Sequence, residues 1–208
     1  MKYIALVILM FSLPCFAVEY NVGLAGAVGL GISRWEGEFY NFEGVYVTDH
    51  LDSKELVYHA GLDLSVWITE AFGIETGVQY GMYNYNYSYE STTDTVESEW
   101  NYDNLLIPIH LMYGIPVAGN RLVIGAGVYI CKELSGSAPG FDIPDTLLMT
   151  NVGPAALLGY EIHTGNLCIF PSFRYVNGIN GLSDQFASSP NISYKHYFML
   201  GVGLLYNL

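Results

Sequence analysis

Apolar residues alternate with small or polar residues over most of this chain, and this period of two constrains the fold more than any other feature. In the segment 22–32 the apolar positions include Val22, Leu24 and Leu30, and glycines or alanines lie between them. Successive side chains of a β-strand point to opposite faces, whereas a helix repeats its apolar positions about every 3.6 residues. The segment is therefore predicted to be a strand with one apolar face and one face of small residues.

Eight segments follow this pattern, the sixth less regularly and with Pro154 inside it, and they cover residues 22–32, 56–68, 72–83, 105–115, 122–130, 148–162, 167–175 and 198–208. Pro108 lies inside the fourth segment. Because proline has no N–H to donate to a neighbouring strand, we expect a bulge or an irregular pairing there. An apolar face opposite a face of small or polar residues is typical of a barrel whose outer surface contacts lipid.

The connections between these segments alternate between short and long. Short joins are predicted near Glu70, at 116–120 and at 163–166, and long polar ones at 35–55, 84–104, 132–146 and 177–194. Bacterial outer-membrane barrels have short periplasmic turns and longer extracellular loops, and their strands need about 9–11 residues each. The fold class predicted is all-β: an eight-stranded antiparallel up-and-down transmembrane β-barrel with both ends on the periplasmic side.

Residues 1–17 have the pattern of a secretory signal peptide, which leaves 18–208 as the barrel. Lys2 supplies the positive start, residues 3–11 the apolar run, and residues 15–17 a small-x-small cleavage site. Acylation of Cys15 is the alternative, but Pro14 replaces the small residue usual before a lipidated cysteine. The predicted location is the bacterial outer membrane.

Charge is scarce and mostly negative. Charged residues make up 13% of the chain and its formal net charge is −13, which disfavours binding to nucleic acid through phosphates. Many of the acids fall in two of the long connections: Glu36, Glu38, Glu43, Asp49, Asp52 and Glu55 in the first, and Glu90, Asp94, Glu97, Glu99 and Asp103 in the second. These connections are predicted to be solvated acidic loops.

Six polar residues fall on faces predicted to point into the barrel: Asp63, Glu75, Gln79, His110, Glu161 and Arg174. The interior of an eight-stranded barrel is narrow and filled by side chains, so these groups can meet. We expect a structural network in which Arg174 balances some of the acids, because buried charges need partners. A proton or ion path is the less favoured interpretation.

No catalytic, cofactor-binding or metal-binding residues are predicted. His59, Asp63 and Ser65 share one strand face, but alternate positions along a strand are about 7 Å apart and cannot form a hydrogen-bonded triad by themselves. The five histidines are dispersed, without the spacing of metal ligands. Cys131 and Cys168 fall on non-neighbouring strands about 9–10 Å apart, too far for a disulfide, so both are expected to be free.

A run of tyrosines stands out near the end of the third segment. Tyr80 is predicted to belong to the aromatic girdle at the membrane interface. Tyr83, Tyr85, Tyr87 and Tyr89 share one face of a strand that could extend past the membrane. They are a candidate contact ribbon for an extracellular protein or glycan, or else they stabilise the hairpin through cross-strand aromatic pairs.

Three segments resemble a known family: Leu105 to Gly114 (LLIPIHLMYG), Phe173 to Ile179 (FRYVNGI) and Phe198 to Leu204 (FMLGVGL). They are similar to the outer-membrane β-barrel domain family of porin-like and PorT-like proteins. The resemblance implies location and fold, and its PorT-like members imply an accessory subunit of a secretion system. The alternating chain end up to Leu208 also resembles the signal read by barrel-insertion machinery.

The leading hypothesis is a non-enzymatic outer-membrane barrel, held in lipid and lipopolysaccharide, whose acidic, tyrosine-rich loops contact an extracellular protein or glycan. The alternatives are the PorT-like secretion subunit, a lipid-modifying or proteolytic barrel enzyme, and an exported lipocalin-type barrel. The last fits poorly, because lipocalins keep their apolar faces inside.

Overall fold

The computed structural model describes residues 19–40, 46–90, 95–138, 140–142, 150–181 and 192–208, and near some loop ends it describes the backbone alone. The proposed signal peptide, 1–17, lies outside the described residues. The strands are β1 (Glu19–Tyr40), β2 (Tyr46–Trp67), β3 (Phe72–Glu90), β4 (Thr95–Val117), β5 (Asn120–Ala138), β6 (Phe141–Asp142), β7 (Thr150–Thr164), β8 (Leu167–Gly181) and β9 (Ile192–Asn207).

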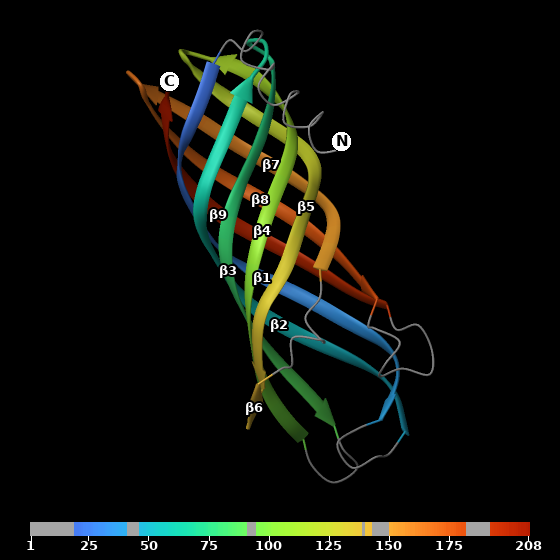
Figure 1. The fold of residues 1–208 in the computed structure, drawn as a ribbon. Helices are drawn as coiled ribbons and strands as arrows, with labels where there is room; N and C mark the ends of the chain where they lie inside the picture. The colour runs from blue at the N-terminus through green and yellow to red at the C-terminus, as the bar shows by residue number, and fades with distance from the viewer. Residues whose placement is uncertain (1–18, 41–45, 91–94, 139, 143–149, 182–191) are drawn as a thin grey trace, which may run out of the picture.

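Eight long strands close into an antiparallel barrel, as the sequence predicted (Figure 1). Each pairs with the next one along the chain, β1 pairs with β9, and the short β6 adds two residue pairs to the end of β5. The amide of Leu208 donates to the carbonyl of Tyr20 at 2.9 Å, so the start of β1 lies beside the end of β9. No helix in the described part of the chain is long and apolar enough to cross a membrane.

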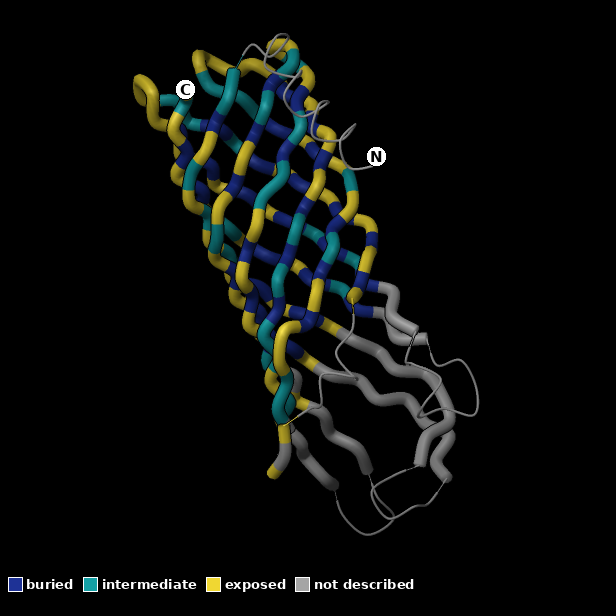
Figure 2. The backbone as a smooth tube through the Cα atoms, viewed as in Figure 1, coloured by how far each residue is buried: buried dark blue, intermediate teal, exposed yellow. Residues whose placement is uncertain are grey.

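Where burial is described, it alternates along the long strands, in the predicted phase for each strand whose faces were predicted (Figure 2). Leu24, Leu30 and Leu200 are 66%, 64% and 67% exposed on the outer surface, while the inward residues are mostly small, polar or aromatic. An outer surface of exposed leucines is unfavourable in water and suits a surface that faces lipid.

The tight turns are where the sequence predicted them. Ala118 and Gly119 join β4 to β5 with φ angles of 50° and 83°, and Gly165 with φ 63° lies in the β7–β8 turn. Two consecutive residues of positive φ are typical of the two-residue hairpin turn whose twist matches that of paired strands. These short joins all lie at the end of the barrel where β9 ends (Figure 1).

Pro108 interrupts the sheet as predicted. β4 stays paired with β5 at Pro108, but on its other side the β3–β4 ladder lacks pairs between Thr76–Ile109 and Gln79–Leu106. A strand residue directs its N–H and C=O to one neighbour, so a proline breaks the ladder on that side only. The register shift itself lies elsewhere, at Asp103/Asn104 between β4 and β5.

The strands continue into all four predicted long loops, most of all into the first two. The β1–β2 hairpin stays paired up to Tyr40–Tyr46 and the β3–β4 hairpin up to Glu90–Thr95. Apolar alternation identifies only the part of a strand that has an apolar face. The backbone can pair beyond that point with polar side chains on both faces, so the prediction placed the strand ends too early.

Candidate functional site

Polar residues of the barrel interior gather at two heights, that is, at two levels along the barrel axis. The Arg174 network consists of Asp63, Glu75, Gln79, His110 and Arg174, and the Arg121 network consists of Glu19, Trp67, Arg121, Glu161 and His163. The second lies nearer the short turns, because its members stand at or near the turn ends of their strands. We treat the two networks together as the candidate site.

Arg174 of β8 reaches across the barrel to two carboxylates. Its Nη2 lies 2.9 Å from Asp63 Oδ2 and 2.6 Å from Glu75 Oε1, although these partners are 111 and 99 residues away in the chain. Gln79 donates to the other oxygen of Asp63 at 2.6 Å, and His110 Nδ1 lies 3.3 Å from Glu75 Oε2. Five of the six residues predicted to form an interior network are therefore in contact.

The Arg174 network is almost entirely removed from solvent. Arg174 and Gln79 are each 6% exposed, and Asp63, Glu75 and His110 are 2–3% exposed. Removing a charge from water is costly, and such a group is stable only where opposite charges and hydrogen bonds replace the lost solvation. The short contacts of Arg174 supply that replacement, which ties β2, β3 and β8 together across the interior.

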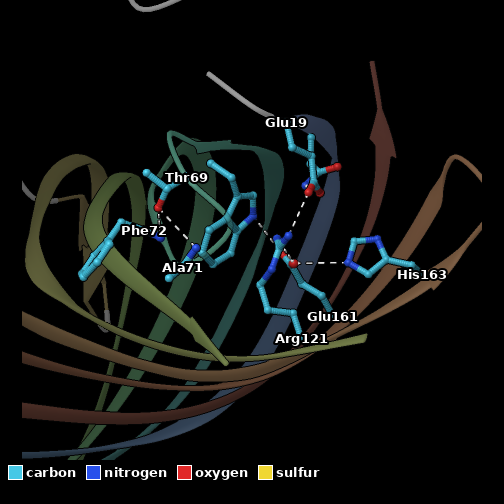
Figure 3. A network of polar contacts seen from close by, with 9 residues as sticks. Glu19, Thr69, Ala71, Phe72, Arg121, Glu161 and His163 are labelled. Atoms are coloured by element: carbon cyan, nitrogen blue, oxygen red, sulfur yellow. Dashed lines mark hydrogen bonds and ion pairs between the residues drawn. The ribbon is translucent and has the colours of Figure 1, made fainter. Parts of the chain in front are cut away.

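The sixth predicted residue, Glu161, belongs to the other network (Figure 3). Its Oε2 accepts from Arg121 Nη1 at 2.7 Å and lies 3.4 Å from His163 Nε2. Arg121 Nη2 also donates to Glu19 at 2.9 Å, so one guanidinium bridges two carboxylates. Glu161 was expected in the network of Arg174, but its hydrogen bonds go to Arg121 and Trp67, nearer the turns.

Trp67 seals the space beside the Arg121 network. Its indole N–H donates to Glu161 Oε1 at 3.2 Å, and Arg121 Cζ lies 4.0 Å from the centre of its ring, within the range of a cation–π contact. The turn after Trp67 is held by Thr69, whose hydroxyl oxygen accepts from the amides of Ala71 and Phe72 at 3.3 and 2.9 Å (Figure 3). These hydrogen bonds hold the end of β2, which carries Trp67, in place.

The sequence prediction missed Glu19, Arg121 and His163. The signal was present: Arg121 continues the inward phase of β5 by one step toward the turns, and Glu19 continues that of β1 by two steps, past the inward Asn21. The prediction began each apolar segment at its first apolar residue and so excluded both. His163 carried the same signal, because it follows the inward Glu161 by two residues, but it lay just past the end of the predicted segment 148–162.

The ligand atoms of Glu19, Glu161 and His163 lie within 4.8 Å of one another, which is close enough to surround a metal ion. Arg121 donates to both carboxylates from within this group. A bound guanidinium supplies the positive charge that a metal would bring. The geometry therefore fits an ion-pair seal and argues for no metal at this position.

His59, Asp63 and Ser65 do not come together as a catalytic triad. His59 Nε2 is 2.9 Å from the hydroxyl of Tyr83, while Asp63 is engaged by Arg174 and Gln79. Ser65 is 5% exposed, and its hydroxyl has no protein partner. Shared strand phase gives these three residues one face, but His59 and Asp63 bond to different partners and the Ser65 hydroxyl bonds to no protein group.

Both cysteines are free, as predicted, and both are buried. Cys131 donates to Asn104 Oδ1 at 3.4 Å. It packs in an apolar cluster with Tyr83 and Tyr129, on the loop side of the Arg174 network. Cys168 packs in a second apolar cluster with Trp67 and Phe170, nearer the turns. The two thiols act as small fillers of the interior.

Tyr83 does not lie on an exposed ribbon. It is 3% exposed, faces the interior, and packs against Tyr197 with ring centroids 5.2 Å apart. The side chains of Tyr85, Tyr87 and Tyr89 lie outside the described residues. Glu55, expected in a solvated acidic loop, is likewise inside β2 and 1% exposed. Tyr83 and Glu55 therefore do not belong to the predicted contact surface.

No protein-family model and no curated protein matches this chain. Among solved structures, the outer membrane protein OprG from Pseudomonas aeruginosa is similar at TM-score 0.63, with 12% identity over 92% of this chain and 96% of that one.

Two further solved structures are similar at lower TM-scores. Neisserial surface protein A gives 0.43, with 14% identity over 88% of this chain and 97% of that one. The outer membrane protease OmpT from Escherichia coli gives 0.48, with 9% identity over 92% and 97%. At such identities the likeness concerns the fold alone. Together with the closed antiparallel sheet, the likeness to OprG shows that this chain has the fold of an eight-stranded outer-membrane β-barrel.

Proposed function

We propose that this protein is a non-enzymatic barrel of the bacterial outer membrane, closed in its interior, whose loop end contacts an extracellular protein or glycan. In this proposal a signal peptide directs export, barrel-insertion machinery places the chain in the membrane, and lipid and lipopolysaccharide surround the apolar outer face. The membrane part serves as an anchor.

The observation that carries this proposal is the filling of the interior. Two apolar clusters and two ion-pair networks fill the interior along the barrel axis. Within each network, the charged groups bond to one another across the interior. A pore would instead present charged groups to water along its length. The described interior is packed like a core, so we assign the interaction to the outside.

The loop end supports the proposed contact surface. The β1–β2 and β3–β4 hairpins continue beyond the strands' apolar segments, and they carry acids that the sequence clusters there. Paired hairpins hold a surface in place better than unpaired loops, which lowers the entropy cost of binding. A basic or hydroxyl-rich partner would match this surface best.

Shortening the two hairpins tests the proposal. Residues 41–45 and 91–94 join the paired hairpins, and each hairpin can be shortened back to the membrane part, with the turn 118–119 lengthened as a control at the opposite end. In cells lacking the native protein, we expect the shortened variants to lose surface binding to extracellular matrix proteins or glycans while the control keeps it. The folded barrel is verified by faster migration of the unboiled sample.

Two outcomes would overturn the proposal. If shortened and full-length barrels bind the same panel equally, the loops do not carry the contact. If the shortened variants bind normally but secreted cargo accumulates in the periplasm, the secretion role implied by the PorT-like resemblance takes its place.

A further inference from the structure

We propose that the barrel holds one buried water molecule between the two ion-pair networks, and that this water joins them into a single hydrogen-bonded column. The proposal concerns the interior alone and is independent of what the loops bind. It starts from Ser65, which faces inward on β2 between Asp63 of the Arg174 network and Trp67 of the Arg121 network.

A small cavity lies at this position. Its volume is about 10 Å³, and its polar lining consists of Asp63, Ser65, Glu75 and Glu161. A water needs a cavity of roughly 10–15 Å³ on this measure and two to four polar partners. Size and lining both match one water, and they leave no space for a second.

Two buried polar atoms of the lining point to an occupant. The Ser65 hydroxyl has no protein partner, and Glu75 Oε2 has only the 3.3 Å approach of His110 Nδ1. Ser65 and Glu75 are directly paired across β2 and β3, so their side chains share one height. A buried polar atom without a partner is destabilising, and a bridging water would remove that penalty.

Water fits this cavity better than a metal or alkali cation. The carboxylates of the lining already bind guanidinium groups, Asp63 and Glu75 that of Arg174 and Glu161 that of Arg121. The rest of the lining is apolar and includes Met112 and Phe170. Hard cations take six or more oxygen ligands, which this lining cannot supply.

The column has a clear direction in the molecule. Glu161 lines the cavity from the turn side and bonds to Arg121, while Glu75 lines it from the loop side and bonds to Arg174. The water would accept from the Ser65 hydroxyl and donate to carboxylate oxygens on both sides. Polar contact would then be continuous from Glu19 to Gln79.

A crystal structure at a resolution that orders waters tests the proposal. We expect one density peak within hydrogen-bond distance of Ser65 Oγ and a Glu75 oxygen. The Ser65→Val variant fills the cavity and removes a partner, so it should lose this peak. Ser172→Ala is the matched control: Ser172 is also buried and inward, but its hydroxyl accepts from Arg174 Nε at 3.5 Å, and the peak should remain.

Two results would overturn the inference. One is a wild-type map in which the side chains of the cavity are ordered and no peak is present. The other is an anomalous peak in the cavity of crystals grown with Tl⁺, which would identify a cation site. The wild-type crystals decide the matter even if Ser65→Val does not yield a folded barrel.

Discussion

Gly127 and Gly203 both face the barrel interior, yet a methyl group would meet very different surroundings at the two positions. A Cβ on Gly127 would collide with the carbonyl oxygen of Ile109 on β4, whereas a Cβ on Gly203 would lie 3.5 Å from Phe170 Cβ. We expect Gly127→Ala to lower the free energy of unfolding by about 1–3 kcal/mol and Gly203→Ala to change it by less than about 0.5 kcal/mol. Urea titration in detergent measures both, and equal values would contradict the close approach of β4 and β5.

Arg174 compensates two buried carboxylates, so its removal should cost more than a lost contact. Arg174→Met leaves Asp63 and Glu75 without the guanidinium that both contact, and breaking a buried ion pair costs about 3–5 kcal/mol. We expect the urea midpoint of unfolding to fall accordingly.

The triple variant Asp63→Asn, Glu75→Gln, Arg174→Met is the control for this prediction. It removes all three charges, and buried ion pairs replaced as a unit are often close to neutral. Recovery of most of the lost stability in the triple variant is expected. A single variant as stable as the wild type would show that Arg174 does not hold the network together.

Among the strands, the β7–β8 seam is the least continuous. Pairs are missing around Pro154 and again around Pro171, while β1 and β9 stay paired without a gap from Asn21–Asn207 to Glu36–Ile192. Backbone groups beside a proline gap lack a partner on that side. We expect amides of β7 and β8 that face the gaps to exchange with deuterium faster than amides of the β1–β9 seam.

A substitution sharpens this comparison. Pro154 is paired with Val128 of β5 and is exposed on the outer surface, so Pro154→Val adds an N–H toward β8 without entering the interior. We expect slower exchange next to residue 154 and no change near Pro171. Uniform protection of the wild-type seams would contradict the interrupted ladder.

For the whole molecule, the two networks act as seals in series. Because each closes the interior at its own height, loss of one leaves the other in place. In planar lipid bilayers we expect no steady channel current from the wild type, and none from Trp67→Ala, which alters the Arg121 network and the apolar cluster beside it but leaves the Arg174 network in place. The unboiled barrel should migrate faster than the boiled chain. Steady stepwise currents from the wild type would overturn the closed interior.

Much of the fold could be predicted locally. Strand phase, the two faces, the tight turns at 118–119 and 165–166, the irregular pairing at Pro108 and the two free cysteines all follow from alternation and from the chemistry of single residue types. These properties depend on a residue and its near neighbours in the chain, so a sequence contains them.

From alternation alone, the chain was predicted to form an eight-stranded barrel with an apolar outer face and a polar interior in which Arg174 balances some of the acids; the structure identifies these acids as Asp63 and Glu75. Which inward side chains lie at the same level along the barrel axis became clear only from the tertiary structure. The register between strands and the tilt of the barrel place Glu161 with Arg121 instead of Arg174, and they bury Tyr83 inside the barrel. Alternation states which face a side chain occupies, but pairing between distant strands sets which side chains meet on that face.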